Sequence, residues 1–288
     1  MKTNSIVVSP FPSIFALRKG IERIGGKEWK AINAAQERWV ELYGRVSGLG
    51  DRFTADELVS IAADTAAEIN EFMARNGFPE IVLDPWAAMP PSVGVGSVLK
   101  VPVKWLQPGV KTAVLSGKFP AFELKPGVAV RRAVDGTIVV EMATQSEDTV
   151  CVAIQEEALA GFDLYDRAVR LDGMEKSRTD FDRVIVPMVN FDEFADTSWI
   201  IGLNTEDATD TPWDVVQAKE KSRFMMNEIG ARLETGFAGQ VMMRSMPAPP
   251  KPYIVDRPFL LWLTRPGIPV PIAACRFEYD VWSEPAEV

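Results

Sequence analysis

The stretch from Met226 to Leu261, "MNEIGARLETGFAGQVMMRSMPAPPKPYIVDRPFLL", decides how the rest of the chain is interpreted. It begins as a strand, continues through a long segment with no firm signal for a helix, and then passes a cluster of four prolines. It ends in an apolar run that favours a buried strand. A patterned segment of this length between two strands is more typical of a functional loop than of a plain connection.

This stretch resembles the reactive-loop region of the serpins. In that family a strand ending in Glu-x-Gly precedes the loop, and the chain returns through prolines into a buried strand that begins Asp/His-x-Pro-Phe-Leu. Glu228, Gly230 and Ala231 match the hinge, and residues 256–260 match the returning strand. The resemblance implies one serpin-like domain over residues 1–288 with an α+β fold. It implies a helical part over 13–77, mixed β-sheets over 95–288 and an exposed reactive loop over 231–252.

The position of the bait residue follows from the same register. In the family the cleaved bond lies about sixteen residues beyond the hinge glutamate, which corresponds to Arg244-Ser245 here. Arginine followed by a small residue suits a protease with an acidic specificity pocket. The resemblance therefore implies a trypsin-like serine protease as the partner.

Residues 231–243 also alternate in the way an inserted strand requires, because successive side chains of a strand point to opposite faces. One face holds Ala231, Leu233, Thr235, Phe237, Gly239, Val241 and Met243. The other face holds Arg232, Glu234, Gly236, Ala238, Gln240 and Met242. The charges fall on one face only. In the family the cut loop joins a sheet as an extra strand and relieves strain. A long surface strand or a mobile loop with accidental alternation is the alternative interpretation.

The composition excludes several kinds of function. The chain has 288 residues, of which 47% are hydrophobic, a net charge of −9 and no histidine. The negative charge disfavours binding to nucleic acid or to an anionic membrane. Without histidine the chain lacks the most frequent general base and metal ligand, so we expect no catalytic residues, no metal site and no cofactor. The run "GVGSVL" lacks the third glycine of a dinucleotide fingerprint.

The two cysteines and the hydropathy pattern indicate the redox state and the cellular location to expect. Cys151 and Cys275 fit no metal-ligand spacing, and buried free thiols are favoured over a disulfide. The sequence predicts no signal peptide and no membrane helix, because no apolar run has the required length. Cytoplasmic residence and removal of a signal both remain open.

The N-terminal segment carries a second part of the resemblance. "NSIVVSPFPSIFAL" is similar to a serpin segment that lies beneath the place where the main sheet opens, and whose hydroxyls hydrogen-bond across the gap. Asn4, Ser9 and Ser13 are the matching polar positions, with Pro12 as one extra residue. Ordinary N-capping by serine is the alternative.

Periodicity predicts the remaining elements. We expect a helix ending at Gly25-Gly26, a second from Glu28 to Tyr43, and a third that begins at a Thr54–Glu57 capping box and runs to Gly77. Strands follow, with a type I′ hairpin at Asp135-Gly136. A helix within 155–171 is ambiguous. The strand that feeds the loop lies within 213–228, and two core strands end the chain.

Three functions remain open at this point. The first is a serpin-like protease inhibitor, and the second is a noninhibitory serpin-fold protein with a binding or structural role. The second is favoured by Leu233, Glu234 and Phe237, since inhibitory serpins usually carry small residues here, and by the missing histidine that ties the sheet shut in many serpins. The third is an enzyme that uses Asp163 or Asp166 near Tyr165, although "FDLYD" is more simply a solvated turn.

Overall fold

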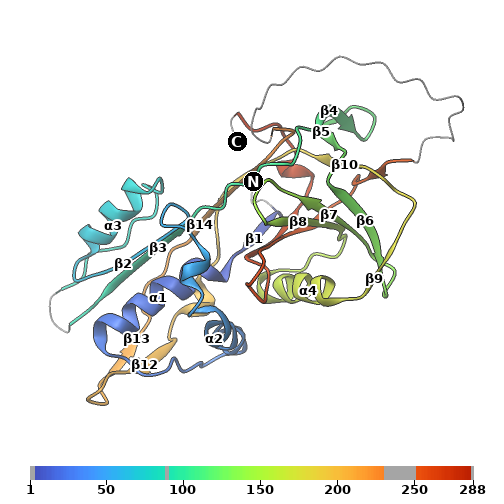
Figure 1. Ribbon diagram of the computed structural model, residues 1–288. Helices are drawn as coiled ribbons and strands as arrows, with labels where there is room; N and C mark the ends of the chain where they lie inside the picture. The colour runs from blue at the N-terminus through green and yellow to red at the C-terminus, as the bar shows by residue number, and fades with distance from the viewer. Residues whose placement is uncertain (1–3, 88–90, 230–250, 287–288) are drawn as a thin grey trace, which may run out of the picture.

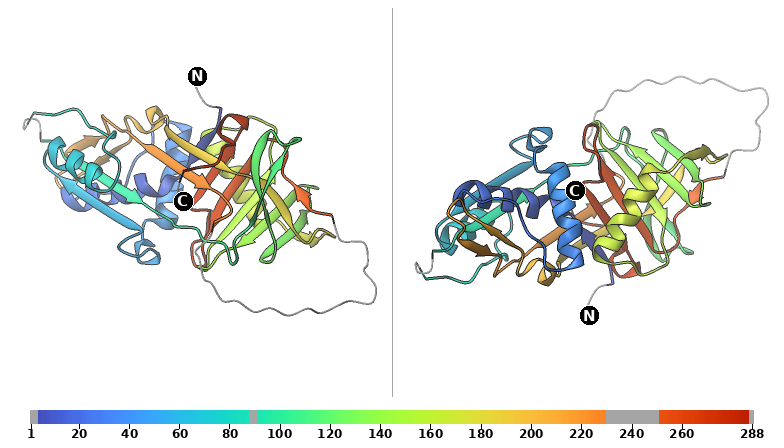
Figure 2. Two further views of the ribbon diagram at one scale, coloured as in Figure 1. Left: turned by 90° about the horizontal axis from the view of Figure 1, so that it is seen from above. Right: turned by 90° about the horizontal axis from the view of Figure 1, so that it is seen from below.

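The computed structural model describes residues 4–87, 91–229 and 251–286. Helices α1 (Pro10–Ile24), α2 (Ala34–Val46) and α3 (Ala66–Arg75) lie at one end of the molecule with three β-hairpins (Figure 1). The other end holds the largest sheet and helix α4 (Gly161–Gly173) (Figure 2). The segment before residue 230 leaves one side of the molecule, and the chain is described again from Lys251. The α+β class is confirmed.

The largest sheet has seven strands in the order β1-β17-β16-β8-β7-β6-β9. Its central strand β16 (Phe259–Thr264) pairs antiparallel with β17 (Ala273–Phe277) and with β8 (Thr149–Ile154). The remaining strands are β1 (Ile6–Val8), β6 (Val128–Ala133), β7 (Ile138–Ala143) and β9 (Lys176–Arg178). Both faces of β16 are buried, which explains why its sequence is apolar without alternation.

Helix α4 covers one face of this sheet and packs on β1, β16 and β17. The Tyr165 hydroxyl donates to the Pro271 carbonyl, and the Trp262 indole donates to Asp172 at 3.2 Å. On β17, Phe277 packs against Phe259 and Phe224, with ring centroids 5.7 and 5.0 Å away. The core therefore runs from α4 through the sheet to the strand that precedes the unplaced segment.

The other strands form four smaller sheets. One has four strands, β15-β10-β5-β4, and contains the parallel pair β10–β15. The hairpin-like pairs are β2–β3, β11–β14 and β12–β13. The bounds are β2 (Leu58–Ala63), β3 (Gly94–Leu99), β4 (Val110–Val114), β5 (Phe119–Leu124), β10 (Val184–Pro187), β11 (Val189–Phe194), β12 (Asn204–Glu206), β13 (Pro212–Asp214), β14 (Lys221–Met226) and β15 (Tyr253–Ile254). Three 3-10 turns cover Gly50–Arg52, Ser198–Ile200 and Tyr279–Val281.

The helix predicted from Thr54 to Gly77 was wrong. The Thr54–Glu57 capping box does form, with both reciprocal bonds, but it closes a turn, and residues 58–63 are strand β2. The helix begins eight residues beyond Leu58, at Ala66, where Thr65 accepts from the Glu68 amide. Helix α1 packs on one side of the β2–β3 pair and α3 on the other (Figure 1). Strand β2 is therefore largely apolar on both faces, and its sequence looked helical.

The structure also corrects the start of the second helix, the state of "FDLYD" and the turn type at Asp135-Gly136. The second helix begins at Ala34 rather than Glu28, because the Asn33 side chain caps it. "FDLYD" is part of α4 and not a solvated turn, and Tyr165 is fully buried. The β6–β7 hairpin turns at Asp135-Gly136 as predicted, but only Gly136 has a positive φ (88°), so the turn is not type I′.

Candidate functional site

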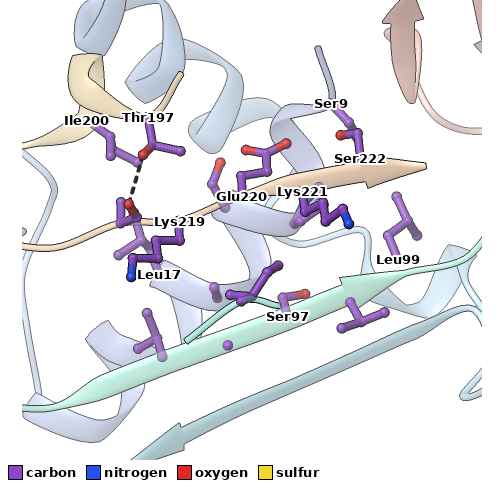
Figure 3. Close-up of a pocket in the computed structure, with 18 of the residues that line it drawn as sticks. Ser9, Leu17, Ser97, Leu99, Thr197, Ile200, Lys219, Glu220, Lys221 and Ser222 are labelled. Atoms are coloured by element: carbon purple, nitrogen blue, oxygen red, sulfur yellow. Dashed lines mark hydrogen bonds between the residues drawn. The ribbon is translucent and has the colours of Figure 1, made fainter. Parts of the chain in front are cut away.

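The strands that face each other at the helical end do not form one sheet. Strand β3 pairs with β2, and β14 pairs with β11, but among the described residues no backbone ladder joins β3 to β14. In Figure 3 the two strands run in the same direction with side chains between them. A cavity of about 430 Å³ lies between them. We call it the inter-hairpin cavity.

Helix α1 forms the floor of this cavity. Pro at the first helical positions and Gly25 in the left-handed conformation (φ 65°) set the bounds of the helix, as the Gly25-Gly26 pair predicted. Ser13, Ala16 and Leu17 face the cavity. Gly20 allows a close approach to β3, since a Cβ there would lie 3.1 Å from Val95 Cγ1. The floor is therefore packed tightly against β3.

The chain that follows α3 forms the roof. Phe78, Ile81, Leu83 and Trp86 line the cavity from above. Residues 77–86, which we call the strap, leave the β2–β3 hairpin and bind the opposite half. The Arg223 guanidinium donates to the Gly77 carbonyl at 2.6 Å and to Glu80 at 2.7 Å. The strap thus spans the opening between the two hairpins.

Two lysines complete this connection. The Lys221 ammonium lies 3.0 Å from both Glu80 and Asp192, and the Lys219 ammonium donates to the Val82 carbonyl. The Glu80 and Asp192 carboxylates raise the pKa of Lys221, and Lys221 in turn lowers the pKa of Glu80. The cations at the start of β14 and just before it, Lys219, Lys221 and Arg223, are therefore all bonded to the strap.

Glu220 lies on the other face. It precedes β14 and continues the ladder, since its carbonyl accepts from the Ala195 amide, so its side chain points away from those of Lys219 and Lys221. Figure 3 shows the Glu220 carboxylate on the opposite side of the strand from both ammonium groups, toward α1 and Ser9. Burial alone raises the pKa of Glu220 to about 7. The prediction from sequence did not single out this residue.

The predicted sheet-opening residues lie partly at this site. Ser9 and Ser13 both line the inter-hairpin cavity. The Ser9 hydroxyl donates to the Ile272 carbonyl at 3.1 Å and makes no side-chain capping bond to α1. Ser13 donates to the Pro10 carbonyl and accepts from the Trp39 indole at 2.9 Å. Asn4 lies elsewhere, with its backbone amide donating to Asp280.

The hinge glutamate lies beyond the other end of β14. Glu228 is buried, its carbonyl accepts from the Gly109 amide at 2.9 Å, and its Oε1 lies 3.2 Å from the Lys111 ammonium. Glu284 and Glu228 together raise the pKa of Lys111. Glu228 Oε2 is buried without a hydrogen bond to any described residue. This contact fixes the start of the loop to β4.

The other predicted positions of the loop cannot be placed. Gly230, Ala231, Arg244 and Ser245 lie outside the described residues, as does most of the predicted loop. The structure places the segments on either side of it. Strand β14 leads to residue 229, and the chain is described again from Lys251, just before β15.

The residues of the alternative enzyme site do not form a shared site. Asp163 and Asp166 point outward to Arg38, at 2.7 and 3.7 Å, whereas Tyr165 is fully buried and bonded to Pro271. Burial raises the pKa of Tyr165 further above its ordinary value. Within the described ranges, no cluster of three acidic or cysteine side chains has the geometry to hold a metal ion.

The cysteine prediction is confirmed. Cys151 on β8 and Cys275 on β17 are both free and buried, and burial raises the pKa of both thiols. None of the helices in the described parts of the chain has the length and apolar character to cross a membrane.

We compared the chain with known families, sequences and solved structures. No known family profile and no curated protein sequence matches the chain. A highly specific serpin of the insect Tenebrio molitor, Serpin48, matches in structure with a TM-score of 0.59 over 96% of this chain and 92% of its own, at 15% identity. The chain has the serpin fold.

Two other solved structures agree with that assignment. SRPN18 of Anopheles gambiae has a TM-score of 0.55 at 13% identity and covers 96% of this chain and 93% of its own. Thyroxine-binding globulin in complex with thyroxine has a TM-score of 0.51 at 13% identity, over 97% and 93% of the two chains.

Proposed function

We propose that the chain inhibits a trypsin-like serine protease. Residues 231–252 act as a bait loop that the protease cleaves between Arg244 and Ser245. Residues 231–243 then enter the opening between β3 and β14 as an additional strand. The chain is not an enzyme, and it needs no cofactor.

The single observation that supports this proposal best is the pair of strand edges beside the inter-hairpin cavity, on β3 and β14, that have no ladder partner among the described residues. Strands β3 and β14 point the same way (Figure 3), so a strand that turned back after β14 would be antiparallel to both. Its backbone groups would pair on both sides. Residues 231–243 follow directly after β14 and Glu228, so they are the nearest segment that can enter.

Cleavage is required for this movement because the loop has two attachments. Its far end leads into β15, which pairs with β10 in the four-stranded sheet, and Val255 donates to the Ile185 carbonyl at 2.9 Å. While residues 244 and 245 stay joined, the segment is held at both ends. A cut at Arg244 frees residues 231–243 from β15.

Incubation with trypsin followed by denaturing electrophoresis tests the proposal. We expect a covalent adduct of protease and inhibitor with the natural sequence and with the Arg232→Ala variant. The Arg244→Ala variant, which lacks the bait residue, should form none. Complete cleavage at Arg244 without adduct would contradict inhibition.

The sequence of the loop supports a second candidate. Leu233, Glu234 and Phe237 are larger than the residues usual in inhibitory serpins, and the solved serpin-fold proteins include a globulin in complex with thyroxine. The alternative function is therefore a noninhibitory protein with a binding or structural role. Cleavage at Arg244 that forms no adduct and leaves stability unchanged would favour it.

A further inference from the structure

The inter-hairpin cavity contains a carboxylate without a partner. The charged residues along its lining are Asp214, Lys219, Glu220, Lys221 and Arg223. The three cations are bonded on the strap side, to Val82, Glu80 and Gly77. The Glu220 side chain makes no hydrogen bond or ion pair with any described residue, whereas its backbone carbonyl accepts from the Ala195 amide. Its pKa is raised by burial alone, which agrees with the lack of a nearby cation.

Glu220 directly precedes β14, and its backbone carbonyl accepts from the Ala195 amide at 2.9 Å, which continues the β11–β14 ladder and gives the carboxylate a defined direction. Phe224, four residues along the same face, packs inward on Phe277 at 5.0 Å. Ser222 lies between them and also lines the cavity. The Glu220 carboxylate therefore faces the interior at the α1 side of the cavity, where Figure 3 places Ser9 nearby.

The remaining lining is apolar. Ala16 and Leu17 of α1, Val95 and Leu99 of β3, and Ile200 line the same cavity. A cavity of about 430 Å³ has the size of a small-ligand site. Asp214, the other acidic residue of the lining, is exposed. Apolar side chains beside the Glu220 carboxylate are complementary to a ligand with an apolar body and one cationic end.

We propose that the inter-hairpin cavity binds small apolar amines, with the ammonium group on Glu220 and the hydrocarbon between α1 and β3. Charge complementarity selects this occupant over a fatty acid, whose carboxylate would be repelled. The hydrocarbon displaces water from Leu17 and Leu99, and the ammonium supplies the missing partner of Glu220. Binding needs no protease and is measured on the intact chain, because residues 231–243 would occupy the same opening after cleavage.

Octylamine, octanol and octanoate are the probes, because they share one hydrocarbon chain and differ in the end group. Binding is measured by calorimetry at about pH 8, where the carboxylate is mostly ionised and the amine is protonated. Emission from Trp199 and Trp213, which line the cavity, gives a second readout. We expect octylamine to bind at least about tenfold more tightly than octanol, and octanoate more weakly than both.

Two variants with the same change of charge locate the site. Glu220→Gln should remove the preference for octylamine over octanol, and it should fold because it removes a buried charge. Glu175→Gln, on an exposed residue away from the cavity, should keep the preference. Ser222→Phe, which fills part of the cavity, should weaken both ligands.

Four results would overturn the proposal. These are no binding of octylamine, equal binding of octylamine and octanol, an unchanged preference in Glu220→Gln, and unchanged binding in Ser222→Phe. None of these results bears on cleavage at Arg244, so this proposal and the proposed inhibition fail separately.

Discussion

The strands of the seven-stranded sheet and those of the two hairpins at the helical end differ in how completely their backbone groups are paired. In the sheet, the central strand β16 has a ladder on each side and is buried on both faces. At the helical end, β3 and β14 each have one ladder and face a cavity across the opening. We call the sheet around β16 the saturated region, because both edges of its central strand are paired. We call the β3 and β14 hairpins the open region, because one edge of each strand has no ladder among the described residues. The two regions therefore differ in how much unpaired backbone and apolar surface they leave among the described residues.

The largest effect is expected in the saturated region. Phe259 is fully buried and packs on Phe277 and Trp282, at 5.7 and 5.9 Å. Phe259→Ala should reduce the free energy of unfolding by about 3 to 5 kcal/mol, since it leaves a cavity in a rigid core. Leu99→Ala at the opening, where the side chain is only half buried, should cost less. Urea unfolding of both variants checks this, and equal losses would contradict the comparison.

The next effect is expected from Glu220 in the open region. Its folded pKa of about 7 lies above the ordinary value of 4.5, so the folded state binds more protons between these pH values. Stability should therefore fall as the pH rises from about 4.5 to about 7, by at most about 3 kcal/mol, and then stay level as far as this group is concerned. Partial access of the carboxylate to the cavity reduces that figure.

The matched variants isolate this contribution. The difference in unfolding free energy between Glu220→Gln and the natural sequence should grow over that pH range, in favour of the variant. Glu175→Gln should show no such trend. A difference that is independent of pH would mean that Glu220 is not buried as the structure places it.

The smallest effect is expected at the strap. Glu80 pairs with Lys221 and Arg223, but it is 39% exposed, so each ion pair contributes little. Glu80→Gln should lower global stability by only about 0.5 to 1 kcal/mol. It should nevertheless speed amide hydrogen exchange across residues 77–86, because this residue joins the two halves. Glu71→Gln, which removes an exposed pair within α3, serves as the control and should leave that exchange unchanged.

The sequence predicted the saturated region better than the open one. The last two core strands and the apolar run at Phe259 were correctly expected, since long apolar runs bounded by prolines and glycines leave few alternatives. Residues 58–63 were misread as a helix. A strand covered by helices on both faces loses its alternation, and short apolar runs of that kind do not distinguish the two structures.

The candidate site was predicted only in part. Ser9 and Ser13 line the cavity and Asn4 lies elsewhere, and their role in sheet opening stays a prediction. Glu220 was missed because "KEKSR" reads as a solvated run of charges. The signal was present, however: in a strand, the glutamate between two lysines must point away from both. The cavity itself depends on α1, β3 and β14 meeting in space, which no local pattern encodes.

The central claim is that the opening between β3 and β14 accepts residues 231–243 after cleavage. Thermal unfolding before and after limited trypsin cleavage at Arg244 tests it most directly. Insertion would bury Leu233, Phe237 and Val241, each contributing about 1.5 to 3 kcal/mol when fully buried, so the cleaved protein should melt well above the intact one. Leu233→Arg, which places an unpaired charge on the inward face, should abolish that gain. A cleaved protein with an unchanged or lower melting temperature would contradict the account.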